Sequence, residues 1–114
     1  MLFSLHSKAL IVGGCELKPS ASCNDANLSG TDLSYLDLTD ASFKRADFTN
    51  SFLAFVNLTD VSLLNADLTD ADLSNATLIG TNFKRADLTN ANLSNADISN
   101  AFFKFTDFSG ADLT

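Results

Sequence analysis

An apolar residue recurs at every fifth position from Leu28 to the end of the chain. The eighteen consecutive centres are Leu28, Leu33, Leu38, Phe43, Phe48, Leu53, Leu58, Leu63, Leu68, Leu73, Leu78, Phe83, Leu88, Leu93, Ile98, Phe103, Phe108 and Leu113. The residue two before the centre is small or apolar, and it is Ala in eleven units. Asp (nine units) or Asn (four units) directly precedes the centre, and Ser or Thr follows it in twelve units. Residues 26–114 therefore repeat a five-residue unit, a pentad.

A period of five fits neither regular secondary structure. On an α-helix, steps of five would spread the Leu positions around the whole cylinder. On a strand, an odd period would send successive centres to opposite faces. The pattern requires a backbone that turns within every pentad, and Asp, Asn, Ser, Thr and Gly at the other positions suit such turns. Pentads stacked in layers can then pair their backbones at the sheet spacing.

These tandem pentads resemble the pentapeptide repeat family. The resemblance implies an all-β fold, a right-handed quadrilateral β-helix with four pentads in each coil. Residues 26–114 would then form about four to five coils. The sequence FKRADFTN at 43–50 returns as FKRADLTN at 83–90, eight pentads later, which agrees with a four-pentad coil. Two similar aromatic pairs, Phe52 with Phe55 and Phe102 with Phe105, are ten pentads apart and do not fit a whole number of coils.

Residues 1–25 contain no pentads and are predicted to form an N-terminal cap segment, a short helix or strand interrupted at Gly13 and Gly14. A secretory signal is the alternative, but the apolar stretch at 9–12 is shorter than such signals require. The sequence stops after Thr114, the fourth residue of the pentad that contains Leu113. We expect either a homodimer through the C-terminal coil or a truncated chain.

Cys15 and Cys23 lie eight positions apart in the cap, on either side of Pro19. They are candidates for one disulfide in an oxidising compartment, such as the periplasm or the thylakoid lumen. The alternative is two buried thiols in a reducing cytoplasm, which is the location that we expect for the protein. No metal site is expected, because two thiols and His6 lack the paired spacing of zinc motifs.

The chain is acidic, with seven Lys plus Arg, fourteen Asp plus Glu and a formal net charge of −7. This balance disfavours direct nucleic-acid binding, which needs clustered cations. No apolar run approaches the roughly 20 residues of a membrane span. With four pentads in each coil, Asp47, Asp67, Asp87 and Asp107 form one acidic column above Asn27, and Asp32, Phe52, Asp72, Asn92 and Asp112 form a second.

The acidic columns allow two interpretations. In the first, each Asp only forms hydrogen bonds to nearby backbone groups in its own turn, a role that Asn, which also occurs at this position, can fill equally well. Alternatively, the first column can present carboxylates to a partner in place of nucleic-acid phosphates.

All five cations of the repeat fall on one row of pentads. They either steer a partner or, in the cases of Arg45 and Arg85, screen Asp47 and Asp87.

Outward-pointing aromatic residues are candidate partner contacts, because exposed Phe is uncommon. Phe102 and Phe105 lie near the C-terminal end, and the others are Tyr35, Phe52 and Phe55. The alternative is packing across neighbouring coils or under the N-terminal segment.

No catalytic constellation is present in the sequence. The only His precedes the repeat, no glycine-rich loop opens a helix, and the Asp residues are expected to face water. We therefore expect no enzyme and no cofactor, but a rigid acidic module that binds another protein or has a structural role. The family resemblance implies an alternative, a DNA-mimicking modulator of DNA gyrase of the kind that confers fluoroquinolone protection.

Overall fold

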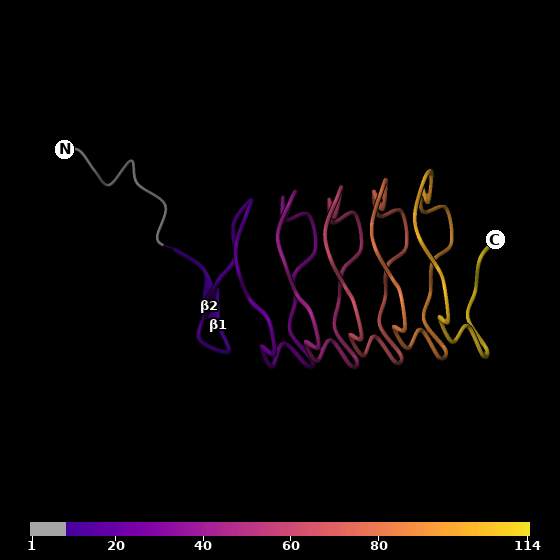
Figure 1. The fold of residues 1–114 in the computed structure, drawn as a ribbon, viewed down its shortest axis with the longest axis horizontal. Helices are drawn as coiled ribbons and strands as arrows, with labels where there is room; N and C mark the ends of the chain where they lie inside the picture. The colour runs from indigo at the N-terminus through magenta and orange to yellow at the C-terminus, as the bar shows by residue number, and fades with distance from the viewer. Residues whose placement is uncertain (1–8) are drawn as a thin grey trace.

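The fold is a stack of coils in a computed structural model that describes residues 9–114. Fifteen parallel backbone bridges run through the stack, from Ser22 with Ser42 to Asn92 with Asp112, and each joins a residue to its equivalent four pentads later. One coil therefore takes four pentads. Figure 1 shows the coils following one another along a single axis, with the β1–β2 hairpin at one end and the C-terminus at the other.

The centre of each pentad and the residue two before it point into the stack. Leu28 to Leu93 are buried at all fourteen centres, and the Ala, Val, Ser or Thr two before each centre is buried in most units. Leu and Phe at the centres contribute most of the apolar burial, about 1.5–3 kcal/mol each. The small partner leaves room for the neighbouring centre, which explains why Ala is preferred there.

Backbone hydrogen bonds join each coil to the next on every pentad. The Leu68 N–H donates to the Asp87 carbonyl at 2.7 Å, and the Asp87 N–H donates back to the Ala66 carbonyl at 2.9 Å. Between consecutive pentads, the Ala71 N–H donates to the Leu68 carbonyl at 3.0 Å and closes a turn. The repeated ladder satisfies the backbone without any long strand.

The last residue of every pentad has a positive φ. Asn, Asp and Gly, which tolerate this left-handed region, occupy most of these positions. Tyr35, Phe55, Phe105, Arg45 and Arg85 adopt the same conformation, with φ between 59° and 66°. These five bulky residues are unfavourable choices for that backbone.

The N-terminal segment contains a short antiparallel hairpin of β1 (Ile11–Val12) and β2 (Cys15–Glu16). Gly13, with a φ of 58°, lies in its turn, where an added Cβ would come within 2.4 Å of the Asn27 carbonyl oxygen. A glycine is therefore required for the hairpin to approach the first coil. The start of the predicted cap, residues 1–8 with His6, lies outside the described residues.

The coils begin before the predicted boundary at residue 26. Residues 21–25 already have the pentad geometry, with Ser22 bridged to Ser42. Ala21 and Cys23 are buried at the two inward positions. Cys23 is thus a pentad centre, although it is neither Leu, Ile nor Phe.

Candidate functional site

The four-pentad register sorts the outward side chains into four rows. Row A comprises residues 21–25, 41–45, 61–65, 81–85 and 101–105. Row B starts with the next pentad, 26–30, row C with 31–35 and row D with 36–40, and each of these rows continues every 20 residues along the chain. Row A carries all five cations of the repeat and the single carboxylate of Asp25, a net charge of +4 (5 − 1). Rows B, C and D carry five, three and four carboxylates and no cation. The protein is therefore acidic on three rows and basic on one.

The predicted acidic column lies on row B. The bridges place Asp47 beside Asp67, Asp67 beside Asp87, and Asp87 beside Asp107, with Asn27 next to Asp47. One carboxylate oxygen of each Asp accepts from the N–H and the hydroxyl two positions later; for Asp67 and Thr69 these distances are 3.0 and 2.6 Å. The hydroxyl and the N–H of Ser109 hold the pKa of Asp107 below its ordinary value. Each carboxylate thus supports its own turn by accepting these hydrogen bonds.

The second column lies on row C and is interrupted by an aromatic residue. Phe52 is bridged to Asp32 on one side and to Asp72 on the other. Asp32 accepts from the hydroxyl and the N–H of Ser34, which lowers its pKa. Phe52 has no acceptor for the corresponding turn, and 54% of it is exposed.

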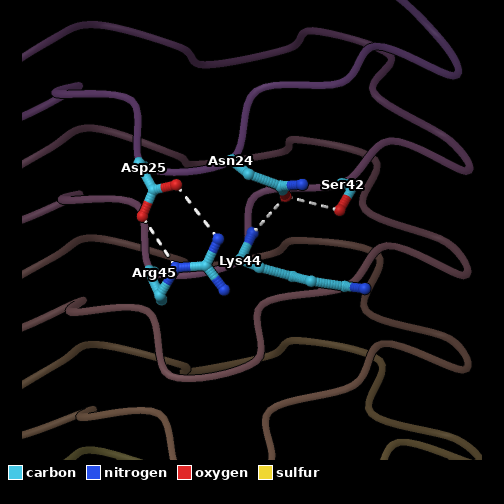
Figure 2. A network of polar contacts seen from close by, with 5 residues as sticks. All are labelled: Asn24, Asp25, Ser42, Lys44 and Arg45. Atoms are coloured by element: carbon cyan, nitrogen blue, oxygen red, sulfur yellow. Dashed lines mark hydrogen bonds and ion pairs between the residues drawn. The ribbon is translucent and has the colours of Figure 1, made fainter.

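The N-terminal end of row A holds a local polar network (Figure 2). The Arg45 guanidinium donates twice to the Asp25 carboxylate, at 2.7 and 3.0 Å. Asn24 accepts from the Ser42 hydroxyl at 2.7 Å and from the Lys44 N–H at 2.9 Å, while the Lys44 ammonium points away from the network. The pKa of Asp25 is lowered by its hydrogen bond with Arg45.

This pairing corrects the suggestion that Arg45 and Arg85 screen Asp47 and Asp87. Arg45 binds Asp25, the residue at its own position in the preceding coil. Arg85 lies over the Phe105 ring, with 5.8 Å between its Cζ and the ring centroid. Residues at the same position in adjacent coils are direct neighbours, whereas a residue two positions along the chain lies on the next row.

The C-terminal end of row A combines the two predicted aromatic contacts with three cations. Phe102 and Phe105 are 63% and 70% exposed. The Lys104 ammonium lies 5.4 Å from the Phe105 ring centroid, on the same ring that Arg85 approaches. Neither of these cations, nor Lys84, forms an ion pair within residues 9–114.

Row C carries the other aromatic cluster. The Tyr35 and Phe55 rings stack across adjacent coils, with centroids 4.9 Å apart and planes 3° from parallel. They remain 73% and 49% exposed, because each ring covers only one face of the other. Packing across coils, one of the two interpretations for these residues, therefore leaves most of the cluster in contact with solvent.

Cys15 and Cys23 are joined by a disulfide, with their Cα atoms 5.4 Å apart. The bond connects strand β2 to the first pentad centre, so it fastens the hairpin to the end of the stack.

The described part of the chain, residues 9–114, contains no pocket and no cluster of three metal-ligating side chains. Within it there is no helix of sufficient length and apolarity to cross a membrane.

A model of the family described as "Pentapeptide repeats" matches the chain in eight copies, over residues 21–60, 53–90, 66–104 and 78–114. Among solved structures, alr5209, a pentapeptide repeat protein from Nostoc Pcc 7120, is 32% identical, with a TM-score of 0.70 over 83% of this chain and 82% of that chain. No curated protein sequence matches.

Two further solved structures have lower structural similarity. A pentapeptide repeat protein from the Arabidopsis thaliana thylakoid lumen is 39% identical, with a TM-score of 0.49 over 76% of this chain. This chain spans 64% of the length of that protein. QnrB1, a plasmid-mediated fluoroquinolone resistance protein, is 17% identical, with a TM-score of 0.40 over 79% of this chain and 61% of that chain.

Proposed function

This chain belongs to the pentapeptide repeat family, whose fold is a right-handed β-helix, and on that premise we propose that it is a rigid, non-enzymatic module that binds another protein through its outward rows. The filled interior carries this proposal: residues 28–93 bury an apolar side chain at every pentad centre, and no pocket opens among residues 9–114. A small-molecule substrate would need a concave site. In this proposal the four rows are the four sides of a quadrilateral coil.

The partner surface that we propose consists of the acidic column Asp47, Asp67, Asp87 and Asp107 together with Phe102 and Phe105. A photo-crosslinking residue placed at Asn65, Asn90, Asn75 or Asn100 samples rows A, B, C and D in turn, because all four positions are exposed. We expect one protein partner to crosslink in the source cells from row A or row B. Absence of any protein crosslink from all four rows would contradict the binding function.

A DNA-mimicking modulator of DNA gyrase is the second candidate, and the unbroken acidic column on row B favours it. The carboxylates repeat at about 4.8 Å along the stack, wider than the roughly 3.4 Å phosphate spacing of one DNA strand. Mimicry would therefore concern the electrostatic field and not the register. We expect the purified protein to inhibit gyrase supercoiling or to protect it from a fluoroquinolone, and Asp67→Lys combined with Asp87→Lys to abolish the effect. An inactive wild-type protein would exclude this candidate.

We also propose that two copies form a homodimer through the C-terminal coil, so that each copy covers the last described pentads of the other. Ile98 and Leu113 are inward-type centres, but both are exposed there. Leu113→Asp should disperse such a dimer in light scattering, because an unpaired charge cannot be buried at the contact. A dimer that survives Leu113→Asp would place the contact elsewhere.

The disulfide supports an oxidising compartment over the reducing cytoplasm, and we propose the former. Intact-mass measurement after alkylation of the native protein tests this directly. We expect neither Cys15 nor Cys23 to be alkylated without prior reduction. Two alkylated thiols in protein taken rapidly from its source cells would favour the cytoplasm.

A further inference from the structure

Two pentads, 51–55 and 101–105, depart from the repeat in the same two ways. Phe replaces Asp or Asn before the centre, at Phe52 and Phe102, so the side chain cannot accept the N–H two positions later. Phe also occupies the last position, at Phe55 and Phe105, with φ values of 61° and 62°. Both changes are locally unfavourable, and neither ring is compensated by full burial. A selective advantage outside the fold is needed to explain them.

With the four rows as the four sides of a quadrilateral coil, the two pentads lie on opposite sides of the stack. They are ten pentads apart, which is two and a half coils at four pentads per coil. The half coil places one on row A and the other on row C, and the two full coils offset them by about 10–12 Å along the axis. The ten-pentad spacing between the two aromatic pairs, which is not a whole number of coils, therefore places them on two different surfaces, row A and row C.

The surroundings of the two pentads carry opposite charges. We call Phe102, Phe105, Lys84, Arg85 and Lys104 the basic aromatic patch. We call Tyr35, Phe52, Phe55, Asp32 and Asp72 the acidic aromatic patch. Each patch exposes aromatic rings beside charges of one sign, and no ion pair within residues 9–114 neutralises either set.

We propose that the basic aromatic patch of one copy binds the acidic aromatic patch of a second copy. Phe rings would stack on Phe and Tyr rings, while the Lys and Arg side chains face the two carboxylates that flank Phe52. The row charges support this pairing, since row A carries +4 and row C carries −3. At physiological salt the Debye length of about 8 Å confines these attractions to the facing rows, despite the net negative charge of both copies.

Because the patches differ and lie on opposite sides, the contact does not close on itself. In a growing assembly both patches of every interior copy are occupied, while one end copy keeps a free basic aromatic patch and the other a free acidic aromatic patch, so further copies add side by side. This association is distinct from the end-to-end homodimer through the C-terminal coil. It also does not depend on the proposed binding of another protein.

Sedimentation equilibrium of the full chain with paired variants tests the inference. Phe102→Asn combined with Phe105→Asn removes the basic aromatic patch, and Phe52→Asn combined with Phe55→Asn removes the acidic one. Asn occupies the same column positions in other coils, at Asn82, Asn65, Asn92 and Asn75, so both variants should fold. A circular-dichroism melt verifies this.

We expect the mass of the wild-type protein to rise with concentration beyond a dimer, without a plateau. Combined with Leu113→Asp, which removes the proposed end-to-end contact, each double variant alone should remain monomeric. An equimolar mixture should form a 1:1 complex and nothing larger, because each variant retains the patch that the other lacks. Ile79→Asn, the same chemical change on row D, and Leu113→Asp should both associate side by side like the wild type.

A charge exchange tests the pairing of the two patches. Lys84→Glu combined with Lys104→Glu should abolish association, as should Asp32→Lys combined with Asp72→Lys. Mixing these two folded variants should restore it, since each supplies the charge that the other needs.

A wild-type protein that stays monomeric at every accessible concentration would overturn the inference. So would a 1:1 mixture of the two Phe variants that fails to associate. Both proposals use Phe102 and Phe105, but a crosslink from row A or row B to a different protein would still support the partner proposal after either result. The two proposals can therefore fail separately.

Discussion

At the residue scale, every position of the pentad has one physical task. The centre fills the interior, and the residue two before it makes room for its neighbours. The Asp or Asn before the centre accepts hydrogen bonds from the residue two later, as Asn57 does from Thr59 at 3.0 and 2.6 Å. The last position requires a left-handed backbone. Turn formation thus explains why an acceptor, Asp or Asn, occupies this position, whether or not a partner uses the charge.

The carboxylate of Asp107 should titrate below its ordinary pKa. The Ser109 hydroxyl and N–H bond its ionised form and thereby lower its pKa. A group with a depressed pKa stabilises the fold above its unfolded pKa of about 3.9, and this contribution is lost as the pH falls through the folded value. We expect Ser109→Ala to raise the pKa of Asp107 in an NMR carboxyl titration. Asp97, which Ser99 affects in the same way, should not move and serves as the internal control.

Ser51→Ala should stabilise the protein. Ser51 occupies the position where most pentads have Ala, and its buried hydroxyl has no hydrogen-bond partner within residues 9–114. Removing an unsatisfied hydroxyl should raise the free energy of unfolding by about 1 kcal/mol, measured by urea titration. Thr81 at the equivalent position donates to the Leu58 carbonyl at 2.8 Å. Thr81→Ala should therefore destabilise, and equal effects of the two substitutions would argue against this explanation.

At the element scale, the coil and not the strand is the unit of structure. A coil is stabilised by the coils on either side of it, through the backbone ladder and the stacked centres. The same pentad therefore has a different energetic value in the middle of the stack and at its end. Phe83 is fully buried, whereas Phe103 in the following coil, stacked on it at 5.2 Å, is only half-buried.

Replacing equivalent centres should show this difference directly. Leu68→Ala opens a cavity in a fully buried position and should cost about 2–5 kcal/mol. Leu113→Ala affects a centre that is 55% exposed and should cost less than about 1 kcal/mol. Urea unfolding measures both variants, and circular dichroism should show that Leu68→Asp does not fold at all. Equal losses from the two Ala variants would contradict a stack whose coils stabilise one another.

The sequence predicts the inward residues well, because the five-residue period depends on local turns. Leu68 and its equivalents are assigned without any knowledge of tertiary contacts. Contacts between rows and coils are harder to predict, since they depend on which residues become neighbours after four pentads. Arg45 forms an ion pair with Asp25, 20 residues before it, and not with Asp47, which is only two residues away in the sequence. The sequence pattern does not predict that Cys23 is a pentad centre, because most centres are Leu or Phe. The β1–β2 hairpin likewise depends on the close approach of Gly13 to Asn27, which no local pattern reveals.

At the scale of the whole molecule, charge is distributed by row. Rows B, C and D together carry twelve carboxylates, and the cations of the repeat are confined to row A. The fixed four-pentad register places like charges one coil apart wherever Asp repeats in a column. Folding must therefore work against repulsion within the columns, and this repulsion depends on ionic strength.

Salt should consequently stabilise the protein, and one carboxylate should account for part of the effect. Asp67 lies between Asp47 and Asp87 in its column, at the coil spacing of about 4.8 Å. Asp67→Asn keeps the turn acceptor and removes the repulsion, which is about 1 kcal/mol per neighbour at most in water. We expect it to raise the melting temperature at low salt and to have little effect at high salt. Asp97, bridged to Thr77, has no carboxylate in the adjacent coil of its column, so Asp97→Asn should show no such salt-dependent gain. An equal rise in melting temperature at low salt for the two variants would mean that the repulsion depends on the net charge of the protein and not on neighbouring carboxylates in one column.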